Sequence, residues 1–143
     1  MTPMLLREYA MRMVGTSYMW GGDDPMKGFD CSGFCIELLQ ASGCLPHGYD
    51  GTAKDLLKEM IKRGGSKVLS ASFGTLCFFG KNPDSISHIG FAMDRDTMIE
   101  AGGGTSTTTT LENAVKSNAF IRLRPINNRS DLLVLCNPVY RWV

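Results

Sequence analysis

The residue with the clearest chemical context in this sequence is Cys31, which follows a glycine-rich stretch and opens a helical pattern. The stretch consists of two short runs, Tyr18-Met19-Trp20-Gly21-Gly22 and Gly28-Phe29-Asp30-Cys31-Ser32-Gly33. Glycines permit a tight loop and Asp30 is a good helix N-cap, so Cys31 is predicted at the first helical position. The unsatisfied N–H groups and the dipole of a helix N-terminus favour an ionised thiol there. The pattern predicts a nucleophilic cysteine, which needs a cationic histidine because the Asp30 charge opposes the thiolate.

The partner of this cysteine must be one of two histidines, because the sequence contains only His47 and His88. His47 lies in a loop with Pro46 and Gly48 and is expected in solvent. His88 opens an alternating segment, so residues 88, 90 and 92 are expected on one face of a strand and residues 89, 91 and 93 on the other, buried face. We therefore predict that His88 pairs with Cys31.

Glu100 is the candidate for a third polar member of the site. A predicted turn at residues 94–96 separates the His88 strand from a strand over 97–101. If the turn has three residues and pivots on Arg95, Glu100 lies opposite Gly90 and diagonal to His88, where long side chains reach one another. A two-residue turn would put Glu100 on the other face, so this contact depends on the register.

The elements that must position these residues change in kind along the chain. Thr2 and Pro3 predict the start of a first helix that ends at Gly15, and further helices are expected over 31–42 and 52–63. The helix over 31–42 has little polar surface and is expected to be the central buried helix. Strands are expected over 76–79, 88–93, 97–101, 119–123 and 132–136, and a loop over the Gly/Thr-rich residues 102–110. Helices followed by consecutive strands predict an α+β fold, with N-terminal helices packed on an antiparallel five- to six-stranded sheet, in a single domain over residues 1–143.

The composition of the 143-residue chain is that of an ordinary globular protein, with 43% hydrophobic and 20% charged residues and a net charge of +1. This charge gives no argument for nucleic-acid binding, and no apolar run approaches the roughly 18 residues of a membrane span. The five cysteines show no disulfide motif and are expected to be reduced, four of them as core residues. Cys31 and Cys35 are one helical turn apart, but two histidines and no Cys-x-x-Cys pair make a metal site a weak interpretation. No metal or cofactor is predicted.

The loop cysteine, the strand histidine and the polar residue on the next strand resemble the NlpC-type cell-wall cysteine peptidases, a compact branch of the papain-like fold. The resemblance covers nearly the whole chain. Both glycine-rich runs fit the nucleophile motif of that family, and residues 87–91 fit its His-Val-Gly strand. Residues 74–79 resemble its Gly-Asp-Leu-Val-Phe-Phe strand, with Thr75 in place of the usual Asp. The family commonly has a histidine or another polar residue where this chain has Glu100, and segments 99–104 and 120–125 resemble phage-encoded members.

The resemblance implies a peptidoglycan hydrolase that cleaves stem peptides, typically at the γ-D-glutamyl bond to a diamino acid. Cys31 would attack the amide carbon, His88 would carry its proton to the leaving amine, and Glu100 would orient the imidazole. The backbone N–H of Cys31 and the hydroxyl of Tyr18 are expected to bind the oxyanion. By the same resemblance, Asp30 and Ser32 contact a polar group of the substrate. Trp20 is expected to anchor the loop without a chemical role.

Two other functions stay open at this point. A related Cys-His amidase or acyltransferase would act on another amide or thioester with the same residues, whereas a wall-binding module would not be catalytic. The start Met1-Thr2-Pro3 has no signal-peptide layout, so we expect synthesis in the cytoplasm. The protein would then reach the wall by lysis, in a phage particle or by dedicated export. We expect a monomer whose partner is the peptidoglycan stem peptide.

Overall fold

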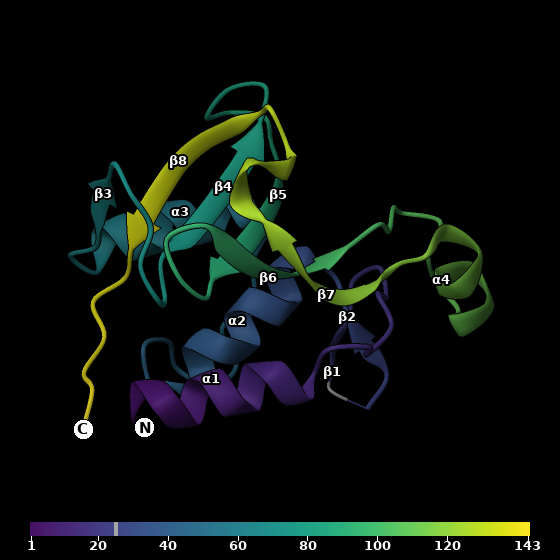
Figure 1. The fold of residues 1–143 in the computed structure, drawn as a ribbon, viewed down its shortest axis with the longest axis horizontal. Coiled ribbons are helices and arrows are strands. Elements are labelled where there is room, and N and C mark those ends of the chain that lie inside the picture. Colours follow the sequence, from purple (N-terminus) through teal and green to yellow (C-terminus); the bar gives the residue numbers. More distant parts are fainter. Residues whose placement is uncertain (25) are drawn as a thin grey trace.

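Four helices and a six-stranded antiparallel sheet make up the fold in the computed structural model, which describes residues 1–24 and 26–143 (Figure 1). The helices are α1 (Pro3–Arg12), α2 (Cys31–Ala41), α3 (Ala53–Lys62) and α4 (Leu111–Ser117). The sheet runs in the order β3-β8-β4-β5-β6-β7, formed by β3 (Ser66–Val68), β4 (Leu76–Gly80), β5 (Ile86–Ala92), β6 (Thr97–Gly102), β7 (Phe120–Pro125) and β8 (Leu132–Asn137). A separate two-stranded ribbon joins β1 (Asp23–Asp24) to β2 (Gly28–Phe29), and the 3-10 turn η1 (Ile126–Asn128) precedes β8. The predicted α+β class is confirmed.

The first three helices begin where their capping residues predict. The hydroxyl of Thr2 accepts a hydrogen bond from the Leu5 amide at 3.2 Å, and Pro3 is the first residue of α1. Thr52 and Asp55 form a reciprocal capping box at the start of α3. Two apolar side chains of these helices remain partly in solvent: Leu5 of α1 is 51% exposed and Ile61 of α3 is 41% exposed. Each lies at the margin of its helix's apolar stripe, where a sequence pattern separates core from surface least sharply.

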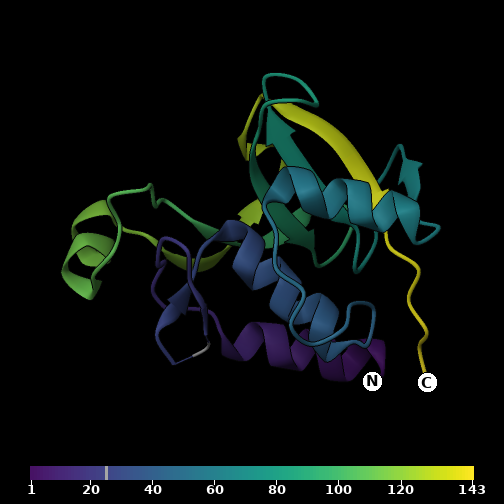
Figure 2. The ribbon, with the colours of Figure 1, turned by 180° about the vertical axis from the view of Figure 1, so that it is seen from behind.

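The helix α2 is the central buried helix, as its composition predicts. Phe34, Leu38 and Leu39 of this helix are fully buried and share one core with Phe78 and Phe91 of the sheet. Figure 2 shows α1, α2 and α3 together on one side of the sheet. This arrangement fixes the axis of α2 against the strands, and it therefore fixes the position of Cys31 at the start of the helix.

The other face of the sheet is buried as well. Cys77, Phe79, Ala92 and Met98 form a second, smaller core with Ile126 of η1. Because side chains alternate along a strand, His88 shares this face with Ala92, as predicted. His88 is itself only 8% exposed, so the strand that carries it is buried on both faces.

The main differences from the predicted elements lie after β6 and before β4. Residues 102–110 form a loop as expected, but α4 follows it, with Thr110 as its N-cap. Figures 1 and 2 show α4 projecting at one end of the molecule. The edge strand β3 and the β1–β2 ribbon were also not expected, because two or three residues carry too little periodicity to be recognised as strands.

Within the described residues, no helix has the length and apolar character needed to cross a lipid bilayer.

Candidate active site

Cys31 is the first residue of α2, and Asp30 fixes the loop that leads to it. One carboxylate oxygen of Asp30 accepts a hydrogen bond from the Gly33 amide at 2.7 Å, which makes Asp30 the N-cap. The other oxygen accepts a hydrogen bond from the Gly21 amide at 3.0 Å. A Cβ at position 33 would overlap the carbonyl oxygen of Gly22, so only glycine allows the loop to lie this close to the helix. The glycine-rich runs thus place Cys31 at a helix N-terminus, as predicted.

Burial and hydrogen bonding act in opposite directions on the carboxyl of Asp30. Burial raises the pKa of this carboxyl, and hydrogen bonds from Gly33, Gly21 and Ser32 oppose that rise. The Ser32 hydroxyl donates to Asp30 at 3.3 Å. Asp30 and Ser32 both line the cavity next to Cys31, while each Asp30 oxygen already accepts a bond from this loop–helix junction.

His88 and Glu100 are brought together by a tight hairpin between β5 and β6. The Met93 amide donates to the Thr97 carbonyl at 2.8 Å, which leaves the three-residue turn that the sequence predicts. Pairing of Phe91 with Ile99 gives the register that puts Glu100 diagonal to His88. The His88 Nε2 atom lies 3.0 Å from Glu100 Oε1 in a hydrogen bond. The predicted contact is present.

A β-bulge lies directly beside His88. Phe79 of β4 pairs with His88 while Gly80 pairs with Ile86, so Ser87 is an extra residue in β5. Bulges bend a strand and redirect the neighbouring side chains, and they are common next to active sites. The His88 ring packs on Phe79 with ring centroids 5.7 Å apart. Gly80 at the end of the Phe-Phe run is the sequence signal that indicates such an irregularity.

Arg122 of β7 is a member of the site that was not predicted from the sequence. It lies opposite Glu100 in the β6–β7 ladder, and its Nε atom donates to Glu100 Oε2 at 3.2 Å. The strand itself was expected over 119–123. Its register against β6 was not, because the loop and α4 between the two strands leave the offset undetermined.

The electrostatics of the site favour an imidazolium next to a carboxylate. Burial lowers the pKa of His88, whereas its interactions with Cys31 and Glu100 raise it, and the net pKa is about 9. Burial raises the pKa of Glu100, but its bonds to His88 and Arg122 lower it by more, so the net direction is downward. At neutral pH, His88 is therefore positively charged and Glu100 negatively charged.

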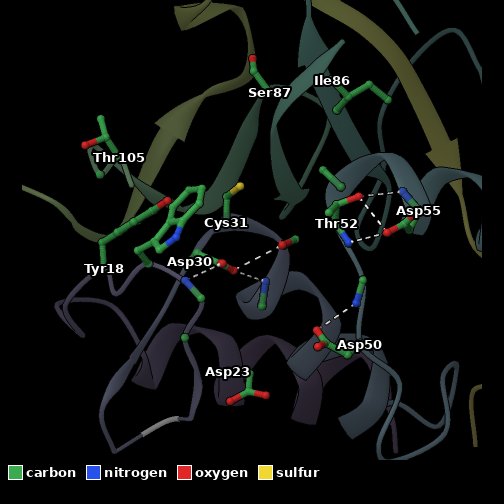
Figure 3. A pocket seen from close by; sticks show the side chains of 18 residues that line it. Tyr18, Asp23, Asp30, Cys31, Asp50, Thr52, Asp55, Ile86, Ser87 and Thr105 are labelled. Carbon is green, nitrogen blue, oxygen red and sulfur yellow. Dashed lines mark hydrogen bonds between the residues drawn. The ribbon is translucent and has the colours of Figure 1, made fainter. Parts of the chain in front are cut away.

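Two cavities meet at Cys31. The larger has a volume of about 620 Å³ and is lined by the glycine-rich loop, the start of α2 and the acidic side chains Asp50 and Asp55. Figure 3 shows the sulfur of Cys31 directed into this cavity, between Tyr18 on one side and Thr52 on the other. The smaller cavity has a volume of about 280 Å³ and is lined by His88, Glu100, Arg122 and Arg129. Because Cys31 lines both cavities, an extended ligand can lie across its thiol with one part in each cavity.

Tyr18 and Trp20 take different positions around Cys31. Tyr18 is only 5% exposed and lines both cavities, with its ring packed on Gly104. Burial and the nearby Cys31 and Asp30 raise the pKa of Tyr18, so its hydroxyl stays protonated and can donate. Trp20 is 54% exposed and lines the larger cavity, so it forms part of the cavity wall.

The remaining candidate groups are His47, the other cysteines and possible metal ligands. His47 is exposed, as expected. All five cysteines are free. Across residues 1–24 and 26–143, no cluster of three or more His, Cys, Asp or Glu side chains is arranged to hold a metal ion.

Comparison with known proteins identifies the family. The sequence profile of the NlpC/P60 family matches residues 15–124. The chain belongs to the NlpC/P60 family. The match takes in Cys31, His88, Glu100 and Arg122, and it confirms the resemblance seen in the sequence motifs.

This NlpC/P60 domain is similar in sequence to a curated relative and in structure to two solved proteins. The bifunctional muramidase/DL-endopeptidase CwlT of Bacillus subtilis is 32% identical over 98 residues, which cover 64% of this chain and 27% of CwlT. The chain thus matches about a quarter of that relative's length. The NlpC/P60 domain of the peptidoglycan hydrolase SagA superimposes with a TM-score of 0.65 at 22% identity, covering 97% of this chain and all of the SagA domain. RipD of Mycobacterium tuberculosis, described as a non-catalytic NlpC/P60 domain protein adapted to peptidoglycan binding, superimposes with a TM-score of 0.67 at 16% identity and 96% coverage of both chains.

Proposed function

We propose that this NlpC/P60 protein is a peptidoglycan hydrolase that cleaves stem peptides as a cysteine endopeptidase. The observation that carries the proposal is the His88–Glu100 hydrogen bond of 3.0 Å, next to a cysteine at the first turn of a helix and at the junction of two cavities. Family membership supports a peptidoglycan substrate, and the DL-endopeptidase CwlT supports an endopeptidase reaction.

The proposed reaction follows from the position and charge of each group. The Cys31 thiolate attacks the amide carbon, and the resulting oxyanion accepts hydrogen bonds from the Cys31 amide and the Tyr18 hydroxyl. The His88 imidazolium then protonates the departing amine, which leaves a thioester on Cys31. A water molecule deprotonated by His88 hydrolyses the thioester. Throughout, Glu100 holds the ring and stabilises its positive charge.

We assign the two cavities to the two sides of the scissile bond. His88 protonates the leaving nitrogen, and it lines the smaller cavity, so the leaving group lies there. The acyl part then occupies the larger cavity, where Asp30 and Ser32 contact its polar group. We propose that the bond is the γ-D-glutamyl bond to a diamino acid, and that the protein acts on the cell wall. An origin in a phage particle stays a prediction.

Two other functions share parts of the same structure. A Cys-His amidase or acyltransferase would use the same thiol and imidazole on a different acyl compound. A non-catalytic wall-binding role has a precedent in RipD, which has the same fold. The presence of both Cys31 and His88 favours catalysis over binding alone.

Defined muropeptides test the proposal directly. We expect the purified protein to release a new free amine from γ-D-glutamyl–diamino acid peptides, identified by mass spectrometry of the products. Cys31→Ser and His88→Ala should abolish turnover while the circular dichroism spectrum stays unchanged. Cys44→Ser is the matched control, since Cys44 lies outside both cavities, and it should react like the wild type. Turnover near the wild-type rate in Cys31→Ser would exclude the mechanism, and binding of muropeptides without any product would support the wall-binding function.

A further inference from the structure

The carboxylate of Glu100 is shared between two cations that come from neighbouring strands. Oε1 faces Nε2 of His88 at 3.0 Å, and Oε2 accepts from Nε of Arg122 at 3.2 Å. We propose that Arg122 is a positioning residue, which holds Glu100 in the orientation and charge state that His88 requires. The inference rests on the proposed function, because it assigns a role within the same site.

Arg122 is fixed from a second direction as well. Its Nη1 atom donates to the carbonyl oxygen of Asn118 at 3.2 Å. Asn118 ends α4 in the left-handed conformation, with φ of 51°. The guanidinium is thus held between the end of α4 and the Glu100 carboxylate, which leaves it little freedom to rotate away.

Gly102 provides the space for this ion pair. A Cβ at position 102 would overlap Oε2 of Glu100 and would come within 2.9 Å of Nη2 of Arg122. Gly102 follows Glu100 by two residues on β6, so it lies on the same face of the strand. The ion pair therefore depends on three residues of two adjacent strands: Glu100 and Gly102 of β6 and Arg122 of β7.

The energetic reason for such a clamp is the burial of Glu100, which is 4% exposed. A buried carboxylate without a partner takes up a proton, and breaking a buried pair leaves an uncompensated charge. Besides Arg122, the His88 ring bonds to Glu100, and the Glu100 charge also acts on the nearby Cys35 and Arg129. Arg129 is already bound by both oxygens of Asp131, at 2.8 and 2.7 Å. Arg122 is the arginine that bonds directly to Glu100.

Arg122 also lines the smaller cavity, so two other roles must be separated from positioning. If Arg122 binds a carboxylate of the substrate, its loss raises KM. If it only stabilises the fold, its loss lowers the melting temperature and leaves kcat unchanged. If Arg122 acts through Glu100, its loss lowers kcat in the wild-type background. The same loss has no further effect in a variant that already lacks the Glu100 charge.

A double-mutant cycle on muropeptide cleavage decides between these roles. We expect Arg122→Gln to lower kcat about tenfold with KM within about twofold of wild type, which corresponds to about 1.4 kcal/mol. Adding Arg122→Gln to Glu100→Gln should cause no further loss, because both changes disrupt one interaction. A raised KM with normal kcat, or losses that multiply in the double variant, would overturn the proposal.

Alkylation of Cys31 gives a second readout that needs no substrate. The rate of iodoacetamide labelling at pH 5 to 6 reports the thiolate–imidazolium pair, which Glu100 stabilises. Arg122→Gln should label about tenfold more slowly there, with partial recovery in Arg122→Lys, which keeps the charge. Arg124→Gln, two residues along β7, is the matched control and should label like wild type. If wild type cleaves no muropeptide, the proposed function fails while this measurement still decides the role of Arg122.

A third variant covers the case in which Arg122→Gln does not fold. Gly102→Ala keeps all charges and forces the Glu100 carboxylate away from its position. It should reproduce the slow labelling and the lowered kcat. Wild-type labelling in a folded Gly102→Ala or Arg122→Gln protein would refute the positioning role.

Discussion

At the scale of single residues, the site is distinguished by the burial of its ionisable side chains. His88 and Glu100 are both almost fully buried; interactions with Cys31 and Glu100 raise the pKa of His88, and interactions with His88 and Arg122 lower the pKa of Glu100. The sequence was sufficient to predict that Cys31 and His88 lie together, because the loop motif is specific and only two histidines compete. It was not sufficient to find Arg122, whose role depends on a strand register that no local pattern determines.

The contrast among the five cysteines leads to a labelling prediction. Burial raises the pKa of Cys35, Cys44, Cys77 and Cys136, to about 12 for Cys77. Cys31 alone lies at a helix N-terminus beside an imidazolium. Iodoacetamide at mildly acidic pH should therefore modify Cys31 well before the other four, as read by peptide mass spectrometry. Earlier labelling of Cys44, the other partly exposed thiol, would contradict the assignment.

The charge of Glu100 leads to a kinetic prediction. Glu100→Gln keeps the shape of the side chain and removes the charge that favours the imidazolium, so kcat should fall by about tenfold or more with little change in KM. Glu100→His should retain appreciable activity, because a neutral imidazole can also accept the His88 N–H. The measurement is kcat and kcat/KM for both variants on one muropeptide. If Glu100→Gln and Glu100→Ala match the wild type, catalysis requires only Cys31 and His88.

At the scale of elements, the start of α2 and the β5–β6 hairpin could be predicted from local chemistry. Capping residues mark the helix starts, and the Asp-Arg-Asp turn sets the hairpin register. The bulge at Ser87 and the helix α4 could not, because they depend on how distant segments pack. Asp30 is the clearest case of a site residue that holds secondary-structure elements in place, since it caps α2 and anchors the glycine loop.

The cap of α2 leads to a prediction that separates stability from activity. Asp30→Ala removes an N-cap and the anchor of Gly21, so it should lower the free energy of unfolding by about 1 to 2 kcal/mol and reduce turnover. Asp30→Asn keeps a capping oxygen, so its free energy of unfolding should fall by only a few tenths of a kcal/mol. Thr2→Ala is the control, because it removes the cap of α1 far from Cys31 and should cost about 1 kcal/mol without loss of turnover. Urea denaturation and muropeptide assays on the same samples test this; equal turnover in Asp30→Ala and Thr2→Ala would show that the cap does not position the thiol.

At the scale of the whole molecule, the fold brings the start of α2 to the part of the sheet that carries His88. Hydrophobic periodicity predicted α1, α2, α3 and the central strands, and their order predicted the α+β class. The burial of both faces of the sheet was not evident, since the second core is closed by η1, a three-residue turn without a pattern of its own. That second burial matters for function, because it gives the His88–Glu100 pair its low exposure and so its dependence on pH.

The buried pair should make the stability of the whole molecule depend on pH in a defined direction. The folded-state pKa of His88, about 9, lies above its ordinary value of 6.5, so its contribution is complete below pH 6.5 and is lost as pH rises through 9. The pKa of Glu100 lies below its ordinary value of 4.5, so its contribution is complete above pH 4.5 and is lost as pH falls through the lowered pKa. The stability advantage of the intact pair over Glu100→Gln should thus be largest between pH 4.5 and 6.5 and should shrink towards pH 9. Each tenfold change in proton affinity is worth about 1.4 kcal/mol.

Urea denaturation at pH 5.5, 7.5 and 9 would measure this advantage, with Cys31 kept in both proteins because its interaction with His88 contributes to the raised pKa of His88. Other ionisable groups are common to the two proteins and cancel in the difference between them. An advantage that is constant from pH 5.5 to 9 would mean that Glu100 contributes shape and hydrogen bonding but no charge interaction to the folded state. An advantage that grows with pH would mean that His88 is neutral in the folded protein, and the pair would then be unable to supply a proton to the leaving amine.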